Sequence, residues 1–435
     1  MTSSPPTAAQ RHKRYQRLVL LLLSLLCANQ TRGDQDFIVG VTTHILEDGG
    51  PLARPLRLML EAGVGSVRDP ALWHIAEAHA GQLQIVADWP RYLDALQEKS
   101  LRSVLALEAD NPEYAGNDGA HRAFARYIDY LSQTFRGQVS FYELGGDRDS
   151  QTTHGSDAYI QLIKDNAARL RRNDPLAKIL AGAISSDALD QGVVEQWVRG
   201  GLLDSIDGLS LQPFVACRKA LGAFTPESWI RWLDDFDKRM TTVAGHPVPL
   251  YLTAMGWPSS PDNCGISENT QAAFLARSFL LARSRPNIKG MWWYELADST
   301  ASVAQRPPHL GLLRSDLSEK PAYDALKVIA PLLTHYRYDA APNLGRNNLY
   351  LMDFSNDDDQ LLAAWAIGQA RQIKIETRND VRGAVQLIDT RQPRRGRIDS
   401  DSHWICQEHR CTAVITLSEF PQIISLGKPN WLFTR

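Results

Sequence analysis

The chain has 435 residues, of which 44% are hydrophobic and 22% are charged, and its formal net charge is -2. This length exceeds one ordinary domain, and it fits a barrel of about 250 to 300 residues with a second small domain. The balanced charge implies no basic face, which argues against nucleic acid as a partner.

The first 33 residues have the pattern of a targeting segment. Basic residues between Arg11 and Arg17 precede an apolar stretch from Leu18 to Leu26. This apolar core is too short to span a bilayer comfortably, so residues 1–33 are predicted to be a signal peptide, with an uncleaved N-terminal anchor as the alternative. The protein is therefore expected to be exported, and to be periplasmic or secreted.

Four cysteines follow the targeting segment, and an even number in an exported chain suggests disulfides. Cys406 and Cys411 are close enough in sequence to close a β-hairpin. Cys217 and Cys264 would lie in loops that follow adjacent strands, which is a plausible pairing. Four free thiols are the alternative. The cysteine and histidine spacings do not indicate a metal site, and no cofactor is expected.

Residues 34–334 alternate short apolar runs with longer amphipathic runs, which is typical of βα units around a parallel sheet. Eight strands are predicted, so we expect an α/β fold, a (β/α)8 TIM barrel. The predicted strands are Phe37–Thr42, Ser66–Arg68, Arg102–Leu107, Val139–Leu144, Ile179–Ile184, Gly208–Leu211, Pro249–Thr253 and Gly290–Glu295. The predicted helices include Pro51–Glu61, Trp89–Glu98, Ala120–Phe135, Asp157–Asn173, Val193–Gly200, Pro226–Val243 and Glu268–Arg283.

Residues 335–435 show short alternating runs separated by turn-type residues. This pattern predicts a small C-terminal β-sandwich. The predicted strands are Asn348–Phe354, Leu361–Ile367, Ile373–Glu376, Ala384–Ile388 and Thr412–Leu417. Four arginines between Arg391 and Arg397 form a basic loop, which is either solvated or in contact with an acidic polymer.

Five short motifs lie at or just beyond the predicted barrel strands, where the catalytic residues of such barrels are found, and a sixth follows the last strand at Lys320. They are Gly63-Val64-Gly65-Ser66-Val67-Arg68, Tyr142-Glu143-Leu144-Gly145-Gly146-Asp147, Gln212-Pro213-Phe214, Thr253-Ala254-Met255-Gly256-Trp257, Trp292-Trp293-Tyr294-Glu295 and Lys320-Pro321-Ala322-Tyr323. In this order and spacing they resemble motifs of the clan-A (β/α)8 retaining glycoside hydrolases, in families such as 39 and 5. The resemblance covers residues 37 to 333.

The resemblance implies two catalytic glutamates, an acid/base after the fourth strand and a nucleophile after the seventh. Here Asp147 stands at the acid/base position and Ala254 at the nucleophile position. Retaining hydrolysis needs a carboxyl group at both positions, and a methyl group cannot attack a sugar. Gly146, Gln212 and Phe214 stand where the family has Asn, His and Tyr. The resemblance therefore implies a degenerate catalytic site.

The remaining candidates are substrate-binding residues at the strand ends, namely Arg68, Glu143, Gln212, Trp257, Trp293 and Glu295. Glu143 is expected to be either a buried partner of Arg68 or a ligand-binding group. Trp257 and Trp293 either stack on the apolar face of a sugar or pack in the core. Glu295 is expected to bind a sugar hydroxyl or to serve a structural role.

We therefore expect an exported, catalytically degenerate protein that binds an oligosaccharide or polysaccharide. The resemblance further implies a setting in bacterial exopolysaccharide synthesis, with an assembly of that pathway as a partner. One alternative is an active glycosyl hydrolase in which Asp147 is the acid, and water or Glu295 replaces the nucleophile. A second alternative is a structural or assembly protein whose barrel has lost its ligand.

Overall fold

The computed structural model describes residues 37–116, 119–145, 156–215, 225–260, 265–299, 309–341, 348–390 and 398–428. Residues 37–435 form one compact unit. The predicted targeting segment at 1–33 and the basic loop between Arg391 and Arg397 lie outside the described residues. Within the described ranges, no helix is both long and apolar enough to cross a membrane.

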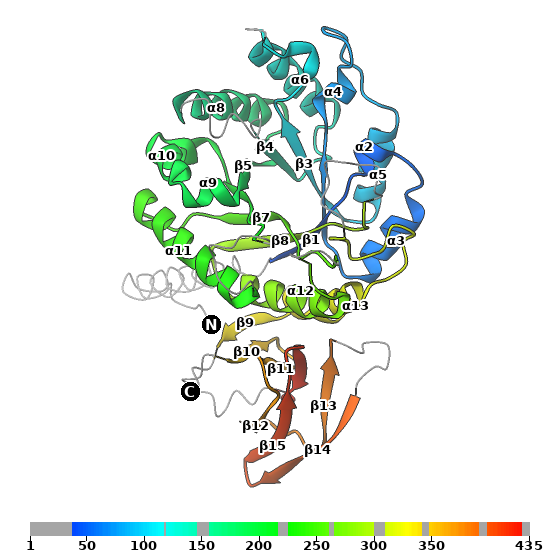
Figure 1. The fold of residues 1–435 in the computed structure, drawn as a ribbon, viewed down its shortest axis with the longest axis vertical. Coiled ribbons are helices and arrows are strands. Elements are labelled where there is room, and N and C mark those ends of the chain that lie inside the picture. The colour runs from blue at the N-terminus through cyan, green and yellow to red at the C-terminus, as the bar shows by residue number, and fades with distance from the viewer. Residues whose placement is uncertain are drawn as a thin grey trace, which may run out of the picture. The chain divides into compact units, whose positions relative to one another are not determined.

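Eight parallel strands close into a barrel, and their order around the barrel is their order in the chain (Figure 1). The ring is completed by pairing between the last strand and the first, which aligns Thr42 with Tyr294. The strands are β1 (Ile38–Thr42), β2 (Ser66–Pro70), β3 (Arg102–Glu108), β4 (Phe141–Gly145), β5 (Lys178–Ser185), β6 (Gly208–Gln212), β7 (Leu250–Met255) and β8 (Ile288–Tyr294). The predicted (β/α)8 TIM barrel is confirmed.

The helices connect the strands and form the outer layer of the barrel. They are α2 (Ile45–Asp48), α3 (Ala53–Glu61), α4 (Trp73–Ala76), α5 (Asp88–Glu98), α6 (Ala120–Thr134), α8 (Ser156–Asn173), α9 (Ser186–Asp190), α10 (Val193–Arg199), α11 (Pro226–Ala244), α12 (Glu268–Arg283) and α13 (Pro321–His335), with 3-10 helices at Pro112–Tyr114 and Leu202–Ser205. Local signals fix α11 at both ends. The Thr225 hydroxyl accepts a hydrogen bond from the Ser228 N–H, and Gly245 terminates the helix with a φ of 76°.

Side chains fill the interior of the barrel below the strand ends. One buried cluster consists of Ile38, Val104, Phe141, Leu180, Tyr251 and Trp292. The Trp292 indole lies directly over Gly40, where an added Cβ would stand 2.2 Å from the indole Cδ1. The Trp292 N–H donates to the Ser66 hydroxyl at 3.1 Å. Because the interior is packed, a ligand must approach the barrel at the strand ends.

An antiparallel sheet of eight strands follows the barrel, in the order β12-β15-β14-β13-β16-β11-β10-β9. Its strands are β9 (Arg337–Ala340), β10 (Leu349–Ser355), β11 (Gln360–Ala366), β12 (Arg371–Thr377), β13 (Gly383–Asp389), β14 (Ile398–Gln407), β15 (Arg410–Leu417) and β16 (Gln422–Ser425). β14 pairs with β13 along its first part and with β15 along its last part, so the sheet curls around a core of its own. This confirms the predicted sandwich-like domain.

Three strands of this sheet were not predicted from the sequence: β9, β14 and β16. β16 lies between β13 and β11, and the side chains of Gln422, Ile423 and Ile424 are all buried. It therefore lacks the alternation of apolar and polar residues that marks a half-exposed strand.

Cys406 and Cys411 form a disulfide across the β14–β15 hairpin, where they are paired directly opposite each other. This is the hairpin in which the sequence suggested a disulfide. The other suggested pair, Cys217 and Cys264, lies outside the described residues.

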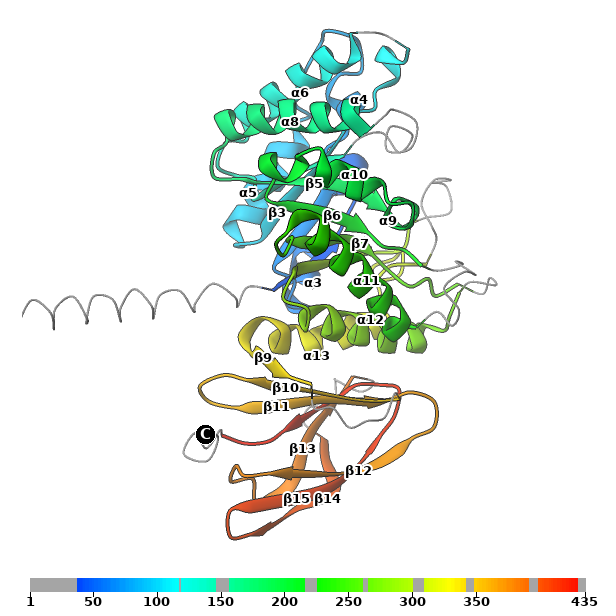
Figure 2. The same cartoon turned by 90° about the vertical axis from the view of Figure 1, so that its left-hand side faces the viewer.

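The sheet packs on the helical layer of the barrel. Phe354, Trp365 and Ile423 belong to the same buried cluster as the barrel helices, whereas a second cluster lies inside the sheet domain. Figure 2 shows β10 and β11 next to α12 and α13. The contact between the two parts is therefore a continuous apolar core rather than a flexible linkage.

Candidate functional site

A buried ion pair crosses the upper barrel between β2 and β4. Arg68 donates from Nε to Glu143 Oε2 at 2.9 Å and from Nη2 to Oε1 at 2.6 Å. Burial opposes ionisation of Glu143, but the Arg68 charge and hydrogen bonds from Arg68, Ser210 and Thr253 outweigh it and lower the pKa of Glu143 below its usual value. Both Glu143 oxygens are thus engaged, so the ionised carboxylate is held in place rather than poised to exchange a proton.

The end of β7 carries no carboxylate. Ala254 is 1% exposed, and the pairing of β7 with β8 shifts register between Leu252 and Met255. From Leu250 to Pro258 the sequence has no Asp or Glu, so a shift of the alignment by a few residues would not supply one. The Ala254 methyl group has neither a lone pair nor an acidic proton.

Gly256 follows Ala254 at a point where the chain passes close to β8. A Cβ at Gly256 would stand 2.2 Å from the Tyr294 carbonyl oxygen, which is fixed backbone. A glycine is therefore required here for the close approach of the two strand ends. The other expected catalytic position, Asp147, lies outside the described residues together with Gly146, and the described part of β4 ends at Gly145.

A second polar cluster joins the ends of β1 and β8. His44 Nε2 lies 3.2 Å from the Tyr294 hydroxyl and 3.5 Å from Glu295 Oε2, while His44 Nδ1 lies 3.5 Å from Glu47 Oε2. Glu295 is 2% exposed, and it accepts hydrogen bonds from the Ser299 hydroxyl at 3.0 and 3.2 Å. A histidine between two carboxylates and a phenol can bind sugar hydroxyls as donor and acceptor.

The segment that carries His44 is fixed by Asp69 of β2. Asp69 accepts hydrogen bonds from the Ile45 N–H at 3.1 Å and the Leu46 N–H at 3.0 Å, and from the Thr43 hydroxyl. Burial raises the pKa of Asp69 to about 6, against these hydrogen bonds. Asp69 is therefore a positioning group beneath His44.

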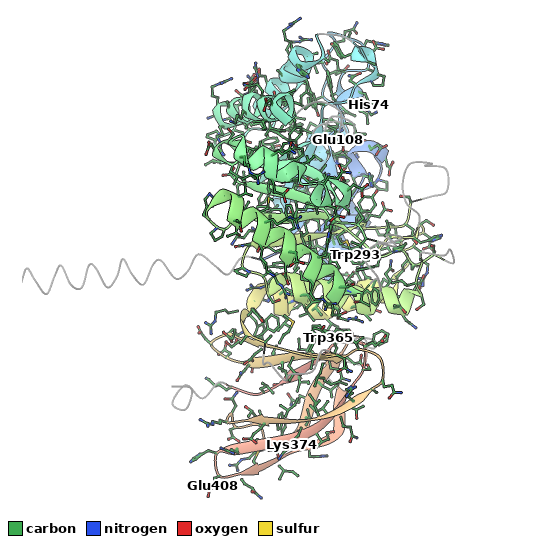
Figure 3. All side chains as sticks on the ribbon, turned by 60° about the vertical axis from the view of Figure 1, so that its left-hand side comes forward. His74, Glu108, Trp293, Trp365, Lys374 and Glu408 are labelled. Carbon is green, nitrogen blue, oxygen red and sulfur yellow. A yellow bond between two sulfur atoms is a disulfide. The ribbon has the colours of Figure 1, made fainter. Side chains whose placement is uncertain are left out.

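Partly exposed aromatic rings at the mouth come from Tyr294 and Phe214. The Tyr294 ring stands edge-on to His44 and to Phe214, with ring centroids 5.6 Å apart in both cases. Polar groups flank these rings at other strand ends, since Gln212 ends β6 and Glu108 ends β3, and both are partly exposed. Figure 3 labels Glu108 in the barrel.

Trp257 and Trp293, the two tryptophans considered for sugar stacking or core packing, are both buried. Trp257 is 2% exposed, and its N–H donates to the Ser278 hydroxyl at 3.1 Å. Trp293 is 0% exposed, and its N–H donates to the Leu310 carbonyl at 2.8 Å. In this structure neither indole presents an open face, so a sugar contact at Trp257 or Trp293 stays a prediction.

The alternation of side chains along β8 indicates that Trp293 and Tyr294 lie on opposite faces of the strand. Trp292 fills the barrel interior, so the next residue points to the helices and the one after it points inward again. The register agrees, because Trp293 aligns with Val41, which faces the helical core, and Tyr294 aligns with Thr42. Tyr294 is thus the inward-facing aromatic residue at the end of β8.

The loops after β7 and β8 are joined by a buried lysine. Lys320 is 1% exposed, and its ammonium group donates to Asp298 at 2.7 Å and to the Ser259 hydroxyl at 3.1 Å. The Gly311 N–H also donates to Asp298 at 2.8 Å. The lysine of the Lys320-Pro321-Ala322-Tyr323 motif therefore has a structural role, because it connects the loops that follow β7 and β8. Among the described residues, no group of three or more His, Cys, Asp or Glu side chains could hold a metal ion.

No protein-family model matches the sequence, and no curated protein sequence matches it. Solved structures do match. A family 39 glycoside hydrolase from the gut symbiont Bacteroides cellulosilyticus has 19% sequence identity and a TM-score of 0.71, with 90% of this chain and 81% of that chain covered. A family 30 subfamily 8 xylanase from Clostridium acetobutylicum has 11% identity and a TM-score of 0.61, with 90% and 97% covered.

A third similar structure is xylanase 10B from Thermotoga maritima, at 15% identity and a TM-score of 0.52, with 68% of this chain and 95% of that chain covered. Structural similarity at these low sequence identities shows a shared fold and does not show a shared activity. The chain has the (β/α)8 barrel fold of the family 39 and family 30 glycoside hydrolases.

Proposed function

We propose that this protein binds an oligosaccharide or polysaccharide at the mouth of its barrel and does not hydrolyse it. The observation that carries the proposal is Ala254, a buried methyl group at the end of β7, in a segment without any carboxylate. The Arg68–Glu143 pair supports it, because the nearby carboxylate at the β4 end is already engaged by two hydrogen bonds from Arg68. Hydrolysis with retention or inversion needs two available carboxyl groups.

The mouth nevertheless retains groups suited to a sugar. A pyranose offers an apolar face, which packs on an aromatic ring, and a rim of hydroxyls, which need donors and acceptors. The Tyr294 and Phe214 rings supply the first, and His44, Gln212 and Glu108 supply the second. Recognition can therefore persist where the bond-breaking chemistry is lost.

Saturable binding of at least one glycan without turnover is the expected result of isothermal titration calorimetry across a broad panel of oligosaccharides and polysaccharides. Tyr294→Ala should weaken that binding by roughly tenfold or more, because loss of a stacking ring and its hydroxyl costs on the order of 1.4 kcal/mol. Tyr130→Ala is the matched control, since Tyr130 is exposed on α6. Absence of binding across the panel, or product formation on long incubation, would reject the proposal.

Restoring a carboxylate in Ala254→Glu is expected to leave the protein without glycosidase activity on aryl glycosides and polysaccharides. Asp147 at the acid/base position is one methylene shorter than the family's glutamate, and the Glu143 carboxylate is held by Arg68. Gly146 and Phe214 also stand where the family has Asn and Tyr, so a carboxylate at position 254 alone does not complete the site. Ala254→Gln controls for the added volume in this buried position. Robust turnover in Ala254→Glu, absent from Ala254→Gln, would show that the rest of the catalytic apparatus is intact.

Export is part of the same proposal. The basic and apolar pattern of residues 1–33 supports it, and the Cys406–Cys411 disulfide is of the kind that persists in oxidising compartments. An exopolysaccharide assembly as partner follows from the resemblance to the hydrolase clan and stands as the proposed setting.

A further inference from the structure

We propose that Trp365 of the C-terminal sheet is a positioning residue for the β6 side of the barrel mouth. The sheet would then set the geometry of the ligand site, although it lies outside the barrel. Figure 3 labels Trp365 where the sheet meets the barrel helices, with Lys374 and Glu408 farther away. The binding arm of the test rests on the proposed function, and the structural arm does not.

Trp365 lies at a buried hydrogen-bonded junction between the sheet and the barrel helices α11 and α12. The Trp365 N–H donates to Glu227 Oε1 at 2.9 Å. Arg277 donates to the same carboxylate from Nε at 2.7 Å and from Nη2 at 2.5 Å. The Tyr350 ring stacks on Trp365 with a centroid distance of 5.0 Å and an angle of 3°. Trp365, Arg277 and Glu227 are each at most 2% exposed, so solvent does not compete for these bonds.

The first turn of α11 links this junction to the end of β6. Glu227 is in the first turn of α11, and two residues later the Trp229 N–H donates to the Pro213 carbonyl at 3.1 Å. Pro213 stands between Gln212 and Phe214, which are two of the groups that face a ligand. The first turn of α11 thus holds Glu227 against the sheet and Trp229 against the mouth at the same time.

The segment after β6 depends on the bond from Trp229, because the pairing of β6 with its neighbouring strands stops before Pro213. The described pairings of β6 end at Leu211 with β7 and at Gln212 with β5. Beyond them, Pro213 is held by Trp229, and the Phe214 carbonyl accepts a hydrogen bond from the Ser186 hydroxyl. A shift of the first turn of α11 would therefore move Pro213, and with it the Phe214 ring that contacts Tyr294.

The test is hydrogen–deuterium exchange mass spectrometry on the full protein, with Trp365→Phe as the main variant. Phenylalanine retains a ring for stacking but removes the N–H. We expect roughly tenfold faster exchange in peptides covering 208–215 and 226–232, because a hydrogen bond to a buried charge is lost. Trp229→Phe, which removes the bond to Pro213 directly, should accelerate exchange in 208–215 as well. Both variants should weaken glycan binding without abolishing it.

The matched control is Trp404→Phe. Trp404 is buried in the core of the sheet domain itself, so this variant removes an indole N–H elsewhere in the same domain. Unchanged exchange in 208–215 for Trp365→Phe, or equal acceleration in Trp365→Phe and Trp404→Phe, would overturn the positioning role. If exchange responds as expected but no glycan binds even to the unaltered protein, the positioning role stands and the proposed function falls.

Discussion

Arg68→Met is expected to lower the free energy of unfolding at pH 7 by about 3 to 5 kcal/mol, because it leaves the Glu143 carboxylate buried without a counter-charge. Glu143 is 1% exposed, so water cannot replace the two hydrogen bonds from Arg68. Methionine retains most of the length of the arginine side chain, which limits the contribution of a cavity. Equilibrium unfolding in urea measures the loss.

The pH dependence of this loss identifies its cause. In the unaltered protein the pKa of Glu143 is lowered, so its stabilisation is present above the unfolded value of about 4.3 and disappears as the pH falls through the lower folded value. In Arg68→Met, burial without the arginine raises the folded pKa, and the variant gains stability as the pH falls from 7. The difference in free energy of unfolding between the two proteins should therefore become smaller as the pH falls from 7 to about 4.5.

A difference that stays constant over this range would mean that lost packing, and not the uncompensated carboxylate, causes the destabilisation. Arg68→Met combined with Glu143→Leu provides the second check. It removes both charges, so it should recover much of the stability lost in the single variant.

Much of the fold could be predicted from the sequence because the barrel strands are buried on both faces. Such strands are short, nearly continuous apolar runs, of which Leu250–Met255 is an example, and they stand out between amphipathic helices. Thr225 and Gly245 cap α11 close to the predicted bounds of this helix, Pro226–Val243. Of the three strands that were not predicted, β14 lies where the sheet bends, and β16 is buried on both faces without a flanking helix to set it apart.

The site was less predictable because its contacts join residues that are distant in the chain. Arg68 and Glu143 could be suggested as partners, since both lie at inward-facing positions, on β2 and on β4, which are separated by β3 alone. The environment of Trp257 and Trp293 could not be derived from their strand-end position alone, because that position does not say which face of the strand is solvated. No local pattern signals that Glu227 meets Arg277 fifty residues later and Trp365 in another domain.

Glu227→Met is expected to lower the free energy of unfolding by about 3 to 5 kcal/mol, comparable with Arg68→Met. The change leaves the Arg277 guanidinium buried and unpaired, and it removes the acceptor of the Trp365 N–H. Because Glu227 touches both α12 and β11, the loss should appear in the unfolding of the barrel and of the sheet together. Urea unfolding followed by tryptophan fluorescence and by far-UV circular dichroism should give coincident transitions.

The double variant Glu227→Met/Arg277→Met decides whether charge is the cause. Removing both charges should restore a large part of the stability, so the two single losses should not add. Asp235→Asn is the surface control on the same helix, since Asp235 pairs with Lys238 and both side chains are at least 70% exposed, and it should change stability little. Additive losses in the double variant would instead assign the stabilisation to packing around each side chain, and would leave the sheet attached to the barrel by its apolar contacts alone.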